Sequence, residues 1–203
     1  MPLLTLTPPP AGDLPPAAET LVADAYQRIA AFSRSSNADN APAFVPADYR
    51  EVYATLDHIH QQQLAPTRRF CEWGSGFGVV AALAQQMGFD ACGIESQSDL
   101  VAAARLLAED HHLAVDFVHG SYIPEAAEHL ADFQDDLATL ARNMADGYDE
   151  LGHDPEDFGV IYAFPWPGEE VFVETLFEQV AAVGALLLTY RSTGDVTLQR
   201  KVI

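Results

Sequence analysis

Residues 72–78 of this chain spell EWGSGFG, and the fold class follows from where this segment stands. It lies between a short apolar run, Arg69–Trp73, and a run of small apolar residues at 79–87, which indicates a turn from a buried strand into a helix. Its three glycines let the backbone turn sharply and approach a ligand closely. The helix that follows offers free N–H groups and a partial positive charge at its start. The segment therefore predicts a ligand-binding loop.

Strand–helix alternation extends along the chain on both sides of this loop. The expected strands are 69–73, 91–95, 115–119, 158–164, 185–190 and 196–202, and the helices between them are 79–87, 98–110, 125–143 and 169–183. This alternation predicts an α/β fold with a doubly wound, Rossmann-like and mostly parallel sheet of about six strands. Because few residues follow Tyr190, we expect the sheet to be truncated at its C-terminal end.

Two regions are expected along the chain. Residues 1–46 hold a proline-rich segment, expected to be extended or mobile, and a helix at 14–34 that packs on the core. Residues 47–203 form the Rossmann-like domain, which begins with a helix at about 47–63. Ligands of such folds bind beyond the carboxyl ends of the strands, so the residues that follow each strand are the candidates for a site.

Glu95 ends the second strand of the alternation and supports a nucleotide-type ligand. It lies 19 residues after Gly76, close to the spacing of about 20 at which such folds place an acidic side chain for the ribose hydroxyls. A dinucleotide fingerprint would need a third glycine where this chain has Val79. The pattern G-x-G-x-G, with Glu72 two places before it, therefore favours a ligand other than a dinucleotide.

The pattern E-x-G-x-G-x-G, followed by Glu95, resembles the class I S-adenosylmethionine-dependent methyltransferases over roughly residues 68–190. The resemblance implies that S-adenosylmethionine is the cofactor and that Glu72 lies near its ammonium or sulfonium charge. The cofactor-binding residues that it implies are Glu72, Trp73, Gly74, Ser75, Gly76, Phe77, Gly78, Glu95, Ser96, Gly120, Ser121, Tyr122 and Tyr162. The segment 44–56 resembles a pre-core segment that folds over the cofactor, but simple packing explains Phe44 and Tyr49 equally well.

Two positions depart from the family pattern. Ser121 stands where the family commonly has an acidic residue near the adenine amino group, and Tyr122 either stacks on the adenine ring or packs under the following helix. After the fourth strand, FPWP at 164–167 keeps a proline–aromatic character but lacks the leading Asp or Asn. The catalytic residues stay open, with these candidates: Phe164, Pro165, Trp166 and Glu169. A first-turn position in a helix explains Glu169 equally well.

Composition limits the partners. The formal charge is −20, from 30 acidic and 10 basic residues, which disfavours a nucleic acid and favours a small-molecule or cationic protein substrate. No apolar run is long enough for a membrane span, and no secretory signal is evident, so we expect a cytoplasmic protein. The histidines form no ligand set, so no metal is expected. Cys71 and Cys92 are expected to be buried thiols without a disulfide. The oligomeric state is open.

An acidic segment at 125–157 carries eleven acidic residues and one basic residue, Arg142. It is longer than a simple crossover requires. Two interpretations stand: a solvated helix with an inserted turn, or a lid that recruits a cationic substrate.

Three functions are compatible with these residues. The first is an S-adenosylmethionine-dependent methyltransferase with an unknown acceptor. The second is a protein that binds the same cofactor without catalysis, because the loop after the fourth strand lacks Asp or Asn. The third is an NAD-dependent oxidoreductase, which Val79 disfavours.

Overall fold

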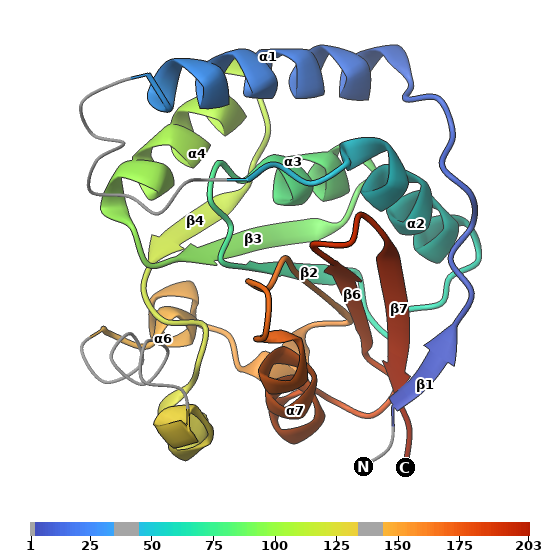
Figure 1. Ribbon diagram of the computed structural model, residues 1–203, viewed down its shortest axis with the longest axis vertical. Coiled ribbons are helices and arrows are strands. Elements are labelled where there is room, and N and C mark those ends of the chain that lie inside the picture. Colours follow the sequence, from blue (N-terminus) through green and yellow to red (C-terminus); the bar gives the residue numbers. More distant parts are fainter. Residues whose placement is uncertain (1–2, 35–44, 134–143) are drawn as a thin grey trace.

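The computed structural model describes residues 3–34, 45–133 and 144–203. Seven of its strands form one sheet in the order β1-β7-β6-β5-β2-β3-β4 (Figure 1). Their bounds are β1 Leu3–Leu6, β2 Arg69–Trp73, β3 Asp90–Glu95, β4 Asp116–His119, β5 Val160–Ala163, β6 Leu186–Tyr190 and β7 Val196–Lys201. β7 runs antiparallel to both neighbours, and the other neighbouring pairs are parallel. The sheet is therefore mostly parallel, as the alternation predicted.

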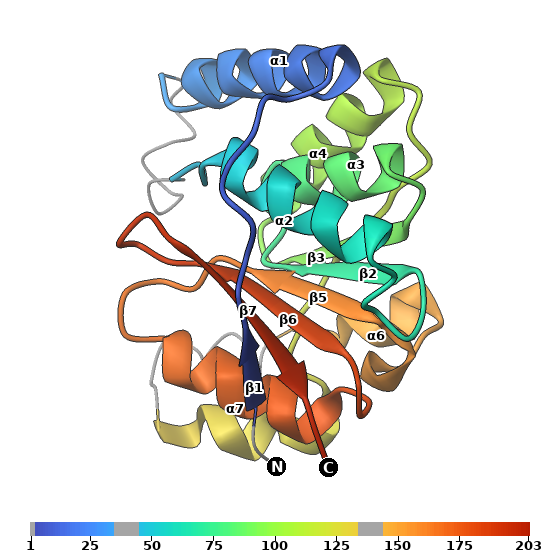
Figure 2. The same ribbon diagram turned by 90° about the vertical axis from the view of Figure 1, so that its right-hand side faces the viewer.

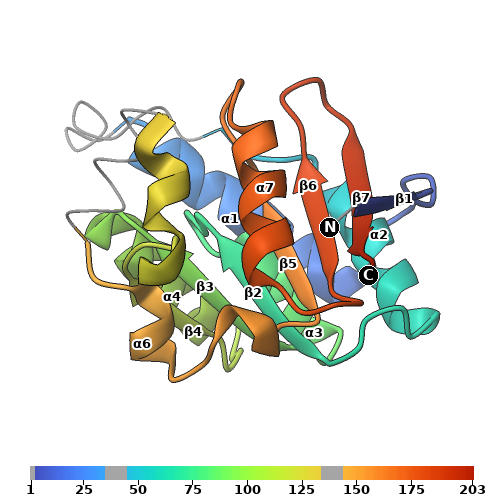
Figure 3. The ribbon, with the colours of Figure 1, turned by 90° about the horizontal axis from the view of Figure 1, so that it is seen from below.

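Helices cover both faces of this sheet (Figures 1 and 2). The face that carries Phe70 is covered by α1 Pro16–Phe32, α2 Tyr49–Gln61, α3 Val79–Gln86 and α4 Ser98–Asp110. The opposite face is covered by the 3-10 helix η2 Glu125–Phe133, by α6 Gly147–Leu151 and by α7 Glu170–Val180 (Figure 3). A short 3-10 turn, η3 Pro155–Asp157, precedes β5. Because each face is covered, the central strands are apolar on both sides.

Two cores result from the alternation of side chains along the strands. In β2, Phe70 faces the α1–α4 side, whereas Cys71 and Trp73 face α6 and α7, and all three are buried. Cys71 pairs in register with Cys92 of β3, and both thiols are free and buried. Burial raises the pKa of the Cys71 thiol, so these thiols pack as small hydrophobic groups.

The crossover pattern leaves a switch point between β2 and β5. From β2 the chain proceeds to β3 and β4 on one side of the sheet, while β5 and β6 pair on the other side. The loops that follow β2 and β5 therefore diverge to opposite faces. A crevice beyond the carboxyl ends of the strands is the usual ligand position at such a point.

The sequence analysis expected about six strands, and the structure corrects this to seven. Leu3–Leu6 lies in the proline-rich segment and pairs antiparallel with β7, with Leu3 opposite Lys201 and Leu6 opposite Leu198. Four residues at a sheet edge carry too little periodicity to indicate a strand, and the partner strand lies at the far end of the sequence. Beyond β6 the sheet continues with β7 and then with β1, which extends it on that side.

The helix expected at 125–143 is also corrected in the described part of that range. Glu125–Phe133 forms a 3-10 helix, and residues 134–143, which include Arg142, lie outside the described residues. The segment after them returns to the sheet: Ser121 donates its N–H to the Ala145 carbonyl (2.9 Å), and Gly147 donates to the Ser121 carbonyl (2.9 Å). This return fixes α6 beside the end of β4. Within the described ranges, no helix has the length and apolarity to cross a membrane.

Candidate functional site

The loop between β2 and α3 needs all three of its glycines. Gly74, Gly76 and Gly78 have φ angles of 65°, 52° and 68°, in the left-handed region that side chains rarely adopt. At Gly78 a Cβ would also lie 2.2 Å from Cζ of Phe117. Around Gly74, by contrast, a Cβ would meet nothing within 4 Å. The loop is therefore packed closely at its helix end and open at its strand end.

Glu95, at the carboxyl end of β3, holds this loop in place. Its Oε2 accepts the Gly76 N–H (2.8 Å), and its Oε1 accepts the Gln97 N–H (2.9 Å) and the Ser96 hydroxyl (3.2 Å). The side chain is buried. A carboxylate has about four acceptor positions, so Glu95 keeps capacity for a ligand hydroxyl while it orders the loop. The hydrogen bond between Gly76 and Glu95 joins the glycine loop to β3, a contact that the sequence analysis did not predict.

Glu72 lies one residue before the end of β2 and is turned toward α3. Its Oε2 accepts the Ala81 N–H (2.8 Å), so it satisfies one of the free donors of the first helical turn. Burial raises the pKa of the Glu72 carboxyl to about 8, the nearby charge of Glu95 adds to this, and the backbone hydrogen bonds oppose it. The buried carboxyl therefore has a structural task that the sequence analysis did not assign to it.

The other side chains of the loop point into the two cores. Trp73 faces the α7 side and stacks on Tyr122, with ring centroids 5.3 Å apart. Phe77 is buried and contacts Phe32 of α1 edge-on at 5.5 Å. Ser75 is buried against Gly93, because a Cβ placed on Gly93 would lie 2.6 Å from the Cβ of Ser75. These three residues anchor the loop, and its backbone is what faces the carboxyl edge.

The residues that follow β4 form hydrogen bonds and packing contacts with nearby residues. Ser121 is buried, and its hydroxyl oxygen accepts the Ile123 N–H (3.0 Å). Gly120 donates its N–H to the Glu95 carbonyl (3.0 Å), and a Cβ on it would lie 2.9 Å from the Ala145 carbonyl. Burial raises the pKa of the Tyr122 hydroxyl, and Glu169 and Glu95 raise it further. The Tyr122 ring stacks on Trp73 of the glycine loop.

The shape of the loop after β5 is set mainly by contacts of its side chains. Phe164 contacts Tyr190 of β6 edge-on at 5.0 Å, and the Trp166 side chain is 49% exposed. Glu169 is the residue before α7, and its Oε2 accepts the Trp166 N–H (3.2 Å). The carboxylate of Glu169 therefore orders the turn from the position just before the helix, and it also lies near Tyr122. Pro165 fixes the start of this turn.

Tyrosines from four elements lie on the α1–α4 side of the sheet, and the sequence analysis missed two of them. Tyr162 of β5 and Tyr49 of α2 are buried, and Tyr26 of α1 lies 5.5 Å from Tyr49 between ring centroids. Tyr190 ends β6. The missed residues are Tyr26 and Tyr190. Tyr190 ends β6 as Glu95 ends β3. Its position at the carboxyl end of an expected strand was the signal that could have identified it. Phe44 lies outside the described residues.

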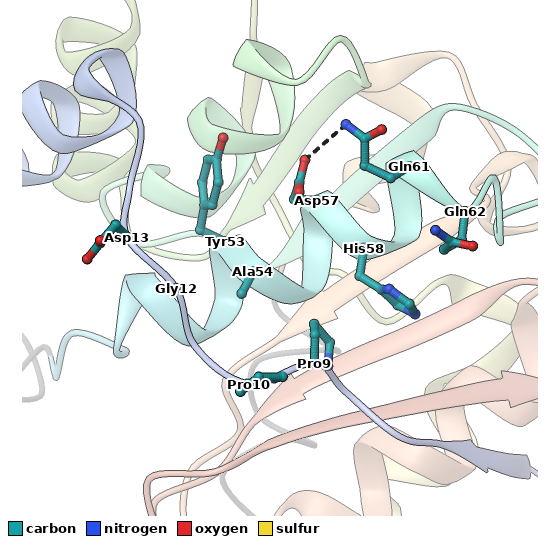
Figure 4. A pocket seen from close by; sticks show the side chains of 10 residues that line it. All are labelled: Pro9, Pro10, Gly12, Asp13, Tyr53, Ala54, Asp57, His58, Gln61 and Gln62. Carbon is teal, nitrogen blue, oxygen red and sulfur yellow. Dashed lines mark hydrogen bonds between the residues drawn. The ribbon is translucent and has the colours of Figure 1, made fainter.

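A hollow of about 370 Å³ lies elsewhere, between residues 9–13 and the outer side of α2 (Figure 4). Its lining includes Pro9 and Asp13 from the N-terminal segment and Tyr53, Asp57 and His58 from α2. None of its lining residues belongs to the loops that follow β2, β3, β4 or β5. This hollow is therefore separate from the carboxyl-edge site. Within the described residues no group of three or more His, Cys, Asp or Glu side chains has metal-binding geometry.

Comparison with known proteins identifies the fold. No family model matches the chain, and no curated protein matches it. Among solved structures, an RNA methyltransferase from Salinibacter ruber in complex with S-adenosyl-L-homocysteine has a TM-score of 0.52 at 18% identity, over 78% of this chain and 94% of its own. A methyltransferase from Geobacter sulfurreducens has a TM-score of 0.54 at 14% identity, over 94% and 92%.

A third similar structure is the O-methyltransferase from Bacillus cereus in complex with S-adenosyl-L-homocysteine. Its TM-score is 0.53 at 14% identity, over 87% of this chain and 66% of that one. The chain therefore has the Rossmann-like fold of the class I methyltransferases, as the sequence pattern implied. One neighbour is described as an RNA methyltransferase and another as an O-methyltransferase, so the likeness shows the fold and leaves the acceptor open.

Proposed function

We propose that this protein is an S-adenosylmethionine-dependent methyltransferase. The observation that carries the proposal is the glycine loop held by Glu95 at the switch point of the sheet. Gly76 donates its N–H to Glu95 at 2.8 Å, and Gly74 leaves open space above the strand end. The two neighbours described with S-adenosyl-L-homocysteine support the proposal, because they share this fold.

The residues present fit this cofactor in three respects. Glu95 has acceptor capacity for ribose hydroxyls, and Ser96 lies beside it. Open space at Gly74 admits a ligand close to the backbone. Glu72 is a buried acid close to the same loop, and its ionised form would be favoured by an ammonium or sulfonium group. The proposed cofactor set keeps the residues of the sequence analysis, with Ser75, Phe77 and Trp73 as anchors of the loop.

Bound S-adenosylmethionine would supply an activated methyl group, so alignment of the acceptor would account for much of the rate acceleration. The chain's own part is to hold the glycine loop rigid and to place the loop after β5 opposite it. Phe164, Pro165, Trp166 and Glu169 remain the candidates to position the acceptor. Ordering of the Trp166 backbone by Glu169 gives this loop a defined shape.

The alternatives fare differently. An NAD-dependent oxidoreductase is disfavoured, because Val79 is the first residue of α3 and its buried side chain packs in the core where a dinucleotide fold has glycine. The Salinibacter ruber neighbour acts on RNA, so the fold is compatible with a nucleic-acid acceptor. The charge of −20 opposes one and supports a small-molecule or cationic protein substrate.

Calorimetry with S-adenosylmethionine and S-adenosylhomocysteine tests the binding. We expect dissociation constants in the micromolar range, about 1–100 μM, and a marked loss of affinity in Glu95→Gln but none in Glu109→Gln, an exposed acid on α4. Absence of binding at millimolar ligand would refute the proposal. Transfer of a labelled methyl group to a fraction of a cell extract separates an enzyme from a protein that only binds the cofactor.

A further inference from the structure

His119 ends β4 at the carboxyl edge of the sheet, next to Glu95 at the end of β3 (Figure 1). The two residues are partners in the parallel register of these strands, so their side chains leave the sheet on the same face. This is the α1–α4 face, on which Phe117 of β4 is buried. Glu95 is buried, whereas His119 is exposed. The carboxyl edge therefore presents an accessible imidazole beside the carboxylate that orders the glycine loop.

Two hydrogen bonds fix the end of β4 against the end of β3. Nε2 of His119 lies 2.9 Å from the carbonyl oxygen of Ser96, and Gly120 donates its N–H to the Glu95 carbonyl (3.0 Å). A carbonyl oxygen can only accept, so Nε2 carries the hydrogen of the first bond. The other ring nitrogen, Nδ1, is then an acceptor in the neutral imidazole. Within the described residues Nδ1 has no hydrogen-bond partner, so it is available to a ligand.

Ser121, two residues further along, offers no equivalent acceptor. Its side chain is buried, and its hydroxyl accepts the Ile123 N–H (3.0 Å) and donates to the Ile123 carbonyl (3.2 Å). These hydrogen bonds stay within its own turn. Of the two side chains, His119 is the one that presents an accessible acceptor at the end of β4.

The strand order sets the direction of the cofactor along this edge. The glycine loop follows β2, Glu95 ends β3 and His119 ends β4, and these three strands are neighbours in that order. In the proposed function Glu95 accepts the ribose hydroxyls, and the methionine end lies beside the glycine loop on the β2 side. Because the base and the methionine end leave opposite sides of the ribose, the base extends toward β4 and His119.

We propose that His119 recognises the adenine base of the cofactor and that its Nδ1 accepts a hydrogen from the 6-amino group. The inference rests on the proposed function and deepens it, because it assigns a residue to base selection. A base with an oxo group at this position would bring a second acceptor against Nδ1, and a base without any group there would leave Nδ1 unpaired. The histidine therefore selects an adenine nucleoside and takes no part in the methyl transfer.

The purine analogue of S-adenosylhomocysteine lacks only the 6-amino group, so it isolates this contact. Calorimetry at pH 8, where imidazoles are mostly neutral, would measure the affinity of both ligands for the wild type and for His119→Phe. In the wild type we expect the analogue to bind at least about five-fold more weakly than S-adenosylhomocysteine. In His119→Phe the difference should shrink to less than about two-fold. The same ratio in both proteins overturns the proposal.

A matched variant and the parent ligand separate the possible failures. His58→Phe, in the hollow on the outer side of α2, should keep the full five-fold difference. If His119→Phe weakens both ligands equally, His119 only supports the segment after β3 and the proposal is overturned. S-adenosylhomocysteine that does not bind the wild type defeats the proposed function, whereas normal binding that does not depend on the amino group defeats only the role of His119.

Discussion

The loops after β2 and β5 leave the same edge of the sheet from adjacent strands, yet they are built in opposite ways. The first is determined by backbone: three glycines with positive φ, and an N–H held by Glu95. The second is determined by side chains, such as the contact of Phe164 with Tyr190 and the exposed Trp166. The difference teaches that cofactor and acceptor sites of one domain carry different constraints. A loop whose conformation depends on glycines tolerates few substitutions. A loop that is shaped by side-chain contacts can change its ligand while the fold stays the same.

The largest effect should come from filling the glycine loop. We expect Gly78→Ala to lower the free energy of unfolding by about 3 kcal/mol or more, because φ is 68° and the new Cβ would collide with Phe117. Gly74→Ala, with a similar φ but open space, should cost only about 1 kcal/mol. Urea unfolding of both variants measures the difference. Equal losses would show that packing against Phe117 has no role.

The next effect depends on pH and on the buried acid. In the folded chain the pKa of Glu72 is about 8, above its ordinary value of 4.5, so between these values the folded state holds a proton that the unfolded state has lost. The contribution of Glu72 to stability therefore falls as pH rises from about 4.5 to 8. We expect Glu72→Gln to be more stable than the wild type at pH 9 by about 2 kcal/mol.

At pH 5 the same substitution should change stability by less than about 1 kcal/mol, because the amide oxygen can still accept the Ala81 N–H. Chemical denaturation of both proteins at pH 5 and pH 9 provides the comparison. A difference that does not vary with pH would contradict a buried, protonated carboxyl at this position.

A smaller effect is expected for Glu95, and it should appear in ligand affinity. Glu95→Gln keeps only one acceptor oxygen, so it cannot accept the Gly76 and Gln97 N–H groups on two oxygens and also hold a ribose. We expect about ten-fold weaker binding of S-adenosylhomocysteine by calorimetry. Unchanged affinity would mean that Glu95 only orders the loop.

The smallest effect should come from the side-chain loop. Trp166 is 49% exposed, so Trp166→Ala should change the free energy of unfolding by no more than about 0.5 kcal/mol. Binding of S-adenosylhomocysteine should also stay the same. A thermal melt and one titration are enough to check this. A loss as large as that of Gly74→Ala would erase the contrast between the two loops.

Sequence predicted those features that depend on local pattern. The strand Arg69–Trp73 and the helix Ser98–Asp110 were located at their observed bounds, because apolar runs and helical spacing are local signals. The positions of the glycine loop and of Glu95 were also predictable, since backbone turns require glycine and strand ends fix the spacing, but the hydrogen bond between Gly76 and Glu95 was not predicted. The role of Glu72 as an acceptor for the Ala81 N–H was not predictable, because it depends on the direction of one side chain.

Features that join distant elements were not predictable. Tyr26 lies in α1 and Tyr190 ends β6, and a single sequence does not show that these distant segments belong to the same side of the sheet. Ser121 received an adenine role from the resemblance, whereas its hydroxyl accepts the Ile123 N–H in its own turn. The acidic segment at 125–157 stays open in part, since residues 134–143 are not described.

The pairing of β1 with β7 has a consequence for folding kinetics. Leu3 meets Lys201, so this ladder closes almost the longest loop in the described chain, and such contacts form only after most of the sheet exists. β1 also lies at the edge and has only four residues, all of which pair with β7. We expect it to dock last and to detach first, so amide hydrogen exchange at Leu4 and Thr5 should outpace that of β2 and β3. The sheet would then fray at its outer strand while the glycine loop, four strands away, stays folded.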